Sequence, residues 1–362
     1  MPSRPIFARA ATALILTSCS LYACTSKSDG ASQPADAGSG TAAGTVSTDT
    51  PRTASDSPAG ASTAFRLTAA DSTRVPNELG RIALAEYHLI TDKDGLYSRE
   101  RGHFRRDLEE IYARGYRPVT ISQILDRKID LPKGLSPIVF VFDDASPSQF
   151  SYIERNGKLE IDPQSGLGIW MEFRKTHPDW PNRAVFCLLS GAEAGRSFFG
   201  NKGIEGQKTE WRFPKLQYLH EQGFELCNHT LWHAQLNKYS DAVVQEQIAR
   251  GNMAIDSAVP GYKVRAFALP LGMWPKNRAL AQRGSWTDPK TGRVVRYENE
   301  AILEVAGGPT RSPYDPQFNP LSMNRLQAVG DDPVKTLDQF DRNGNRYVSD
   351  GNPATVAKPP AK

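Results

Sequence analysis

The feature that most constrains this chain is an alternation of apolar, strand-like runs with helical patterns between residues 82 and 269. Strands are expected at 82–88, 118–121, 137–142, 184–189, 224–227 and 264–269, and helices at 104–112, 213–221 and 241–257. Such alternation is typical of βα units that build a parallel sheet or barrel. A single barrel domain over residues 66–340 would have a normal size for that fold, which takes about 250 residues.

The first 24 residues have the pattern of an export signal. Their apolar run is too short to span a bilayer as a helix. Residues 16–19 (LTSC) resemble the lipobox of bacterial lipoproteins, and residues 21–24 (LYAC) resemble it less well, so Cys19 or Cys24 would carry the lipid. A cleaved secretory signal is the alternative. The protein is therefore expected to be exported, and either lipid-anchored at the cell envelope or secreted.

The segment that follows the signal is poor in large apolar side chains. Between Thr25 and Ala64 the only large aliphatic residue is Val46. Such a segment cannot bury enough apolar surface to offset the entropy lost on ordering. We expect a disordered linker at 25–65 and a loose tail at 341–362.

Charge and cysteine content exclude several classes of protein. The chain has 44 Lys and Arg against 40 Asp and Glu, with no basic block, so nucleic acid is not an expected partner. Four Cys without a CxxC pair exclude a disulfide-dense scaffold and a structural zinc module. Cys187 and Cys227 fall on strands expected to be neighbours. Two free thiols are favoured over a disulfide, because adjacent strands seldom give good bridging geometry.

Polar side chains gather at the carboxyl ends of the expected strands, where βα barrels place their reactive groups. They are His88 after the first strand, Asp143 and Asp144 after the run at 137–142, and His229 and His233 after the run at 224–227. Two His at i and i+4 on a helical turn can share a metal ion, with a carboxylate from another strand as third ligand. Only six His occur in the chain, and three of them lie at these strand ends. The sequence therefore favours a catalytic metal site with an open coordination position.

These residues and their motifs resemble the polysaccharide deacetylases, the NodB-like family also called carbohydrate esterase family 4. The motifs are YHLI from Tyr87, VFDD ending at Asp144, NHTLWH ending at His233 and FALPLG ending at Gly272. The resemblance covers residues 80–330 and implies an α/β fold, a distorted (β/α)7 barrel. It also implies that Asp144, His229 and His233 bind a divalent metal, usually zinc, and that Asp143 is the general base.

The implied reaction is removal of N-acetyl groups from an extracellular or cell-wall polysaccharide that contains N-acetylglucosamine. A bound metal ion polarises an amide carbonyl and lowers the pKa of water, and a neighbouring carboxylate can take the proton of that water. The expected partners are the acetylated polysaccharide and, through a lipid anchor, a membrane. The protein is expected to be a monomer.

The chain departs from the commonest family pattern in two places. No His follows His233, so the late His that serves as general acid in many members is missing. Ala268 and Leu269 stand where an Arg often precedes the Pro of the FALPLG motif. The chain is closest to the poly-N-acetylglucosamine deacetylase-like subgroup, in which the first-strand His can act as the acid, so His88 is assigned that role.

Four further residues are candidates for substrate binding: Trp232, Pro270, Trp274 and Arg325. The two Trp side chains could stack on a sugar ring, and Arg325 could also orient the base carboxylate through paired hydrogen bonds. The long segment 146–180 is interpreted as an elaboration over the active-site face. The alternative functions are deacetylation of another acetylated glycan ester and an inactive carbohydrate-binding barrel.

Overall fold

The structure is a computed structural model that describes residues 64–330 and 332–358. The predicted signal at 1–24, the two candidate lipidation sites Cys19 and Cys24, and nearly all of the linker at 25–65 lie outside the described residues. Within the described part of the chain, no helix combines the length and the apolar character needed to cross a bilayer.

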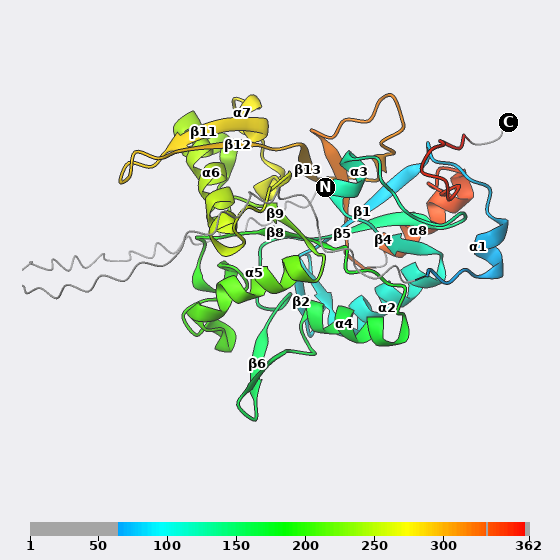
Figure 1. Cartoon of the computed structure of the whole chain (residues 1–362), viewed down its shortest axis with the longest axis horizontal. Coiled ribbons are helices and arrows are strands. Elements are labelled where there is room, and N and C mark those ends of the chain that lie inside the picture. The colour runs from blue at the N-terminus through cyan, green and yellow to red at the C-terminus, as the bar shows by residue number, and fades with distance from the viewer. Residues whose placement is uncertain (1–63, 331, 359–362) are drawn as a thin grey trace, which may run out of the picture. The chain divides into compact units, whose positions relative to one another are not determined.

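Seven parallel strands close into a barrel at the centre of the domain (Figure 1). In order around the barrel they are β1 (Arg81–Tyr87), β5 (Ser136–Phe142), β8 (Val185–Leu188), β9 (Glu225–Asn228), β10 (Ala266–Ala268), β13 (Ala301–Gly307) and β15 (Met323–Gln327), and β15 pairs with β1 again. The short strands β14 (Thr310–Arg311) and β4 (Tyr116–Pro118) extend the sheet beside β1 and β5. The predicted (β/α)7 barrel is confirmed.

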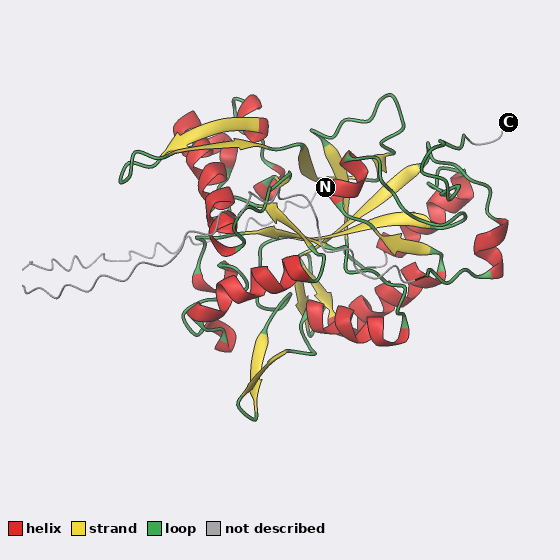
Figure 2. Cartoon of the chain, viewed as in Figure 1, coloured by secondary structure: helices red, strands yellow, loops and turns green. Residues whose placement is uncertain are grey.

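Helices surround the barrel, and three two-stranded pairs lie outside it, one parallel and two antiparallel (Figure 2). The helices are α1 (Ala69–Thr73), α2 (Arg101–Ala113), α3 (Ile121–Leu125), α4 (Gly166–Thr176), α5 (Arg212–Glu221), α6 (Asp241–Ala258), α7 (Ala279–Gln282) and α8 (Asp332–Asn343). The outer pairs are β2 (Leu89–Thr91) with β3 (Ser98–Glu100), β6 (Tyr152–Arg155) with β7 (Lys158–Ile161), and β11 (Arg283–Thr287) with β12 (Val294–Glu298). The predicted helices at 104–112, 213–221 and 241–257 correspond to α2, α5 and α6.

Alternate side chains of each barrel strand face two different cores. Ile82 and Leu84 of β1 pack in the barrel interior, whereas Ala83, Ala85 and Tyr87 pack outward against the helices. Because side chains alternate with period two along a strand, Glu86 and His88 continue the inward series of β1, and Asp143 continues that of β5. The interior is therefore apolar in its middle layers and charged at the carboxyl end of the strands.

The amino end of the barrel is closed by α3, whose Ile121 and Ile124 join the interior core. The strand predicted at 118–121 therefore ends at Pro118. Thr120 is the cause, because its side chain caps α3 and the Gln123 side chain accepts a hydrogen bond from the Thr120 N–H in return.

The first half of the tail at 341–362 is packed against the barrel, whereas the sequence predicted a loose tail. Tyr347 and Val348 are buried, and Val348 pairs with Asn77 in an antiparallel bridge. The guanidinium of Arg346 donates to Ser136 Oγ at 2.7 Å and lies 4.1 Å from the centre of the Tyr116 ring. These large side chains give residues 346–349 enough buried contact to pack onto the barrel.

The segment 146–180 also differs from the expectation. Its hairpin, β6–β7, projects from the body of the domain (Figure 1), and α4 packs against α2 on the outer side. Only its first residues approach the barrel mouth, where the Gln149 amide donates hydrogen bonds to the backbone carbonyls of His88 and Asp143.

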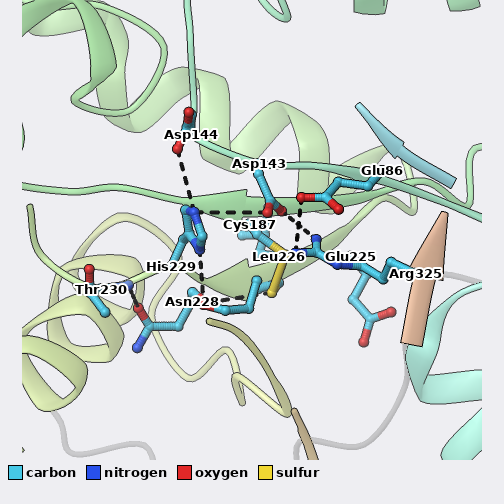
Figure 3. Close-up of a disulfide and its surroundings, with 12 residues drawn as sticks. Glu86, Asp143, Asp144, Cys187, Glu225, Leu226, Asn228, His229, Thr230 and Arg325 are labelled. Carbon is cyan, nitrogen blue, oxygen red and sulfur yellow. Dashed lines mark hydrogen bonds and ion pairs between the residues drawn. A yellow bond between two sulfur atoms is a disulfide. The ribbon is translucent and has the colours of Figure 1, made fainter. Parts of the chain in front are cut away.

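A disulfide joins Cys187 and Cys227 inside the barrel (Figure 3). The two residues are direct partners in the parallel register of β8 and β9, and their Cα atoms are 4.2 Å apart. The expectation of two free thiols is therefore wrong. Both side chains lie on the concave face of a closed sheet, where facing side chains converge more than on a flat sheet.

Removal of this disulfide is expected to destabilise the barrel. The bond closes a loop across a sequence separation of 40 residues, and loops of that order contribute roughly 2–4 kcal/mol by restricting the unfolded chain. Cys187→Ala/Cys227→Ala should lose about that much free energy of unfolding in urea titrations compared with the oxidised native protein. Reduced native protein is the matched control and should resemble the double variant. Equal stability of all three would contradict this assignment.

Candidate metal and catalytic site

Asp144, His229 and His233 converge at the carboxyl end of the barrel (Figure 3 shows the first two). One ligand atom from each lies within 4.8 Å of the others. Asp144 Oδ1 is 3.4 Å from His229 Nε2 and 3.5 Å from His233 Nε2. The structure therefore brings together the three predicted metal ligands, which come from the ends of β5 and β9.

The two His lie on a loop after β9, not on the helical turn that their spacing predicted. Thr230 and His233 have positive φ angles of 73° and 65°, which reverse the chain and prevent a helix here. Thr230 Oγ1 accepts the N–H groups of His233 and Ala234, and Asn228 Oδ1 accepts the N–H of Thr230. These side-chain caps stabilise a tight loop that directs both imidazoles to one point.

The chemistry of these groups fits a divalent cation. His229 Nδ1 lies 2.9 Å from the Ala268 carbonyl oxygen, so Nδ1 carries the proton and Nε2 presents its lone pair to the site. Burial lowers the pKa of His233 to about 4, which keeps its imidazole neutral near pH 7. Asp144 Oδ1 is buried and faces both imidazoles. A buried carboxylate oxygen beside two imidazole nitrogens is the donor set that zinc prefers.

Arg196, which the sequence did not single out, provides a positive charge beside this donor set. Its Nη2 lies 2.5 Å from Asp144 Oδ1, and its side chain is 39% exposed. Burial opposes ionisation of Asp144, but the contacts with His229 and Arg196 hold the pKa of this carboxyl below its usual range. A cation bound at Asp144 would compete with Arg196, whose partly exposed side chain has room to move.

Asp143 is held by Arg325 in the buried interior beside the metal-ligand set (Figure 3). Arg325 Nη1 donates to Asp143 Oδ1 at 2.9 Å, and its Nε donates to the Glu304 carbonyl oxygen. Burial opposes ionisation of Asp143, but the charge of Arg325 holds the pKa of this carboxyl below its usual value. Asp143 is therefore an ionised carboxylate, with its Oδ2 3.8 Å from His229 Nε2.

Arg325 and Pro270, two of the predicted substrate-binding residues, both lie in the buried interior. Arg325 contacts Asp143, which fits the predicted orienting role, and its side chain has 0% exposure. Pro270 is also buried, and its contact with a substrate stays a prediction. Arg325 lies in the interior because it is on the inward face of β15, and Pro270 because it begins the tight turn after β10.

The two Trp candidates differ in accessibility. Trp232 is 40% exposed between the two His ligands and can present its ring to a bound molecule. Trp274 is half-buried: its indole N–H donates to the Glu304 carboxylate, and Arg278 lies 3.8 Å from the ring centre. Trp232 is thus the better placed of the two.

His88 lies at the edge of the site, together with Glu86, a residue that the sequence reasoning missed. His88 Nε2 is 3.5 Å from Glu86 Oε1, and the imidazole is 15% exposed and packs edge-on against Tyr97. Burial lowers the pKa of His88. The signal for Glu86 was available, because a charged residue two positions before His88 in an apolar strand must share its face.

Comparison with known proteins agrees with this geometry. Residues 183–284, which run from β8 into β11, match the family model described as polysaccharide deacetylase. This part of the chain is therefore similar to polysaccharide deacetylases. A chitooligosaccharide deacetylase of Sinorhizobium fredii (strain NBRC 101917 / NGR234) is 29% identical over 120 residues. That match covers 32% of this chain and 54% of the relative, so it spans only about half of that protein's length.

Two solved structures are also similar to this chain. The Streptococcus pyogenes deacetylase PplD in complex with acetate superposes with a TM-score of 0.50 at 15% identity, covering 72% of this chain and 97% of that one. IcaB from Ammonifex degensii gives a TM-score of 0.48 at 15% identity, covering 73% of this chain and 98% of that one. The similarity to PplD supports the closed barrel described above.

Replacement of Arg325 should destabilise the domain strongly. Arg325→Ala would leave Asp143 and Glu86 as buried carboxyls without their counter-charge, which costs about 3–5 kcal/mol of unfolding free energy. Chemical denaturation at pH 7 measures the loss. The control is Arg250→Ala, which removes the exposed ion pair with Glu246 on α6 and should cost less than about 1 kcal/mol. Similar losses in the two variants would contradict the role given to Arg325.

Proposed function

We propose that this protein is a metal-dependent hydrolase that removes N-acetyl groups from an extracellular or cell-wall polysaccharide containing N-acetylglucosamine. The observation that carries the proposal is the convergence of Asp144, His229 and His233 next to a carboxylate, Asp143, that Arg325 keeps ionised. The relationship to polysaccharide deacetylases supports the same reaction class.

Asp144, His229 and His233 would bind the divalent cation, with zinc the ion that best suits one carboxylate and two imidazoles. When bound, it supplies Lewis-acid polarisation of the amide carbonyl and lowers the pKa of a water molecule. Asp143 takes a proton from the attacking water. His88 donates a proton to the leaving nitrogen as the C–N bond breaks and its electron pair passes to nitrogen, which gives acetate and a free amine.

We propose further that the polysaccharide contacts Trp232, whose exposed ring lies beside the metal-ligand loop. We also propose that the protein is exported and reaches its polymer from a lipid anchor on Cys19 or Cys24, or as a secreted protein. Its signal-like first 24 residues support export.

Acetate release from N-acetylglucosamine oligomers tests the reaction. The full chain with zinc should release acetate, and a chelator should abolish the release until zinc is added back. Asp143→Asn should reduce kcat by about 10²–10⁴ because it removes the base while retaining the metal ligands. Asp288→Asn, on the β11–β12 hairpin, is the matched control and should keep native activity.

The same assay separates the alternatives. Acetate release from acetylated xylan but not from the oligomers would favour ester deacetylation. Binding of the oligomers without any zinc-dependent release would favour an inactive carbohydrate-binding barrel and would overturn the proposed function.

Metal binding itself provides a second test. Asp144→Asn and His233→Ala should each weaken zinc binding by at least about tenfold in isothermal titration calorimetry, because each removes one of three protein ligands. Asp143→Asn should bind zinc within a few-fold of the native protein. Native affinity in the Asp144 and His233 variants would contradict the ligand assignment.

A further inference from the structure

Glu86 is a buried carboxyl at the carboxyl end of the barrel that the proposed reaction leaves without a role. It is 1% exposed, and neither of its carboxylate oxygens takes part in a hydrogen bond with the described residues. A buried acid without such contacts is costly, so its presence in an otherwise apolar strand requires an explanation.

The charges around Glu86 define its protonation. Arg325 of β15 lies 3.2 Å from Glu86 Oε1 and also binds Asp143 of β5, so one cation faces two carboxyls. His88 on the same strand faces Glu86 from 3.5 Å, and Asp144 adds negative charge from the end of β5. With both carboxyls ionised and His88 neutral, this buried group would carry one uncompensated negative charge. One additional proton, on Glu86 or His88, restores neutrality.

The proton belongs mainly to Glu86. Burial, followed by the charge of Asp143, raises the pKa of Glu86 to about 8 despite the opposing charge of Arg325. Burial at the same time lowers the pKa of His88. A second metal ion at Glu86, His88 and Asp143 is disfavoured, although their ligand atoms lie within 4.8 Å of one another, because Arg325 already places a positive charge against both carboxyls.

We propose that Glu86 is a positioning residue that supplies His88 with the proton delivered to the leaving nitrogen; this inference rests on the proposed deacetylase function. Glu86 faces Nε2 of His88, which leaves Nδ1 to face the substrate. As Nδ1–H passes its proton to the amine nitrogen, Nε2 takes the proton of the Glu86 carboxyl. His88 remains neutral as the other tautomer, and Glu86 becomes a carboxylate paired with Arg325.

A small cavity gives this pair a route for proton return. It has a volume of about 10 Å³ and is lined by Glu86, His88, Tyr97, Arg99 and Gln327, among others. That volume is close to the minimum that accommodates one water molecule. Glu86 can thus regain its proton after turnover from a water molecule in this cavity.

The pair can be tested without turnover by histidine NMR of the zinc-free protein, with the His88 signals assigned from His88→Gln. In the native protein the His88 signals should show an inflection near pH 8, where Glu86 loses its proton. The inflection should disappear in Glu86→Gln. It should persist in Glu225→Gln, which alters a buried carboxyl at the opposite end of the same barrel. A native His88 without this inflection would overturn the proposal, even if the glutamine variant did not fold.

Kinetics of the zinc-loaded enzyme supply the second readout. Glu86→Gln should lower kcat by about tenfold or more with KM nearly unchanged, since only proton delivery is affected. The basic limb of the kcat profile should move to lower pH, because the proton would then be held by His88 alone. Native kcat and an unmoved basic limb would overturn the role of Glu86. Absence of acetate release from the native enzyme would instead overturn the deacetylase function, which the NMR titration does not depend on.

Discussion

The buried guanidinium of Arg325 is the interaction on which the rest of the site depends. Arg325 lies in a closed barrel whose middle layers are apolar. It binds Asp143 and faces Glu86 within that interior. Two carboxyls could not share so small a dry space without a fixed cation, because isolated buried charges are strongly unfavourable. Arg325 therefore stabilises the buried charges at this end of the barrel. It also contacts Asp143 and Glu86 differently, so their pKa values differ.

The proposed deacetylation needs one ionised carboxylate as base and one protonated carboxyl as a source of the proton. The charge of Arg325 holds the pKa of Asp143 below its usual value, whereas burial raises the pKa of Glu86 to about 8. A base and a proton reserve thus coexist a few ångströms apart around one arginine, as acid and base pairs do when their environments separate their pKa values. The adjacent Asp144 is not bound by Arg325 and faces His229 and His233.

Much of this was predictable from the sequence, since strand ends were marked by apolar runs followed by polar residues. The parallel βα architecture and the Asp144, His229 and His233 cluster follow from that pattern, whereas the closed (β/α)7 barrel and the orienting role of Arg325 were implied by the resemblance to polysaccharide deacetylases. The loop geometry of the two His was not predictable from spacing, because i and i+4 fit a helix as well as a tight turn with positive φ angles. The disulfide depended on the register of β8 and β9, and Arg196 reaches Asp144 from a three-residue 3-10 helix (Ala194–Arg196) that is too short to leave a periodic pattern in the sequence.

The central claim is that one carboxylate and two imidazoles bind a single cation at the barrel mouth. X-ray absorption spectroscopy of the zinc-loaded protein tests it most directly. The account predicts one zinc per chain with nitrogen and oxygen neighbours only, at about 2.0–2.2 Å, and with scattering from two imidazole rings. A sulfur shell near about 2.3 Å, or a zinc ion without imidazole scattering, would contradict it.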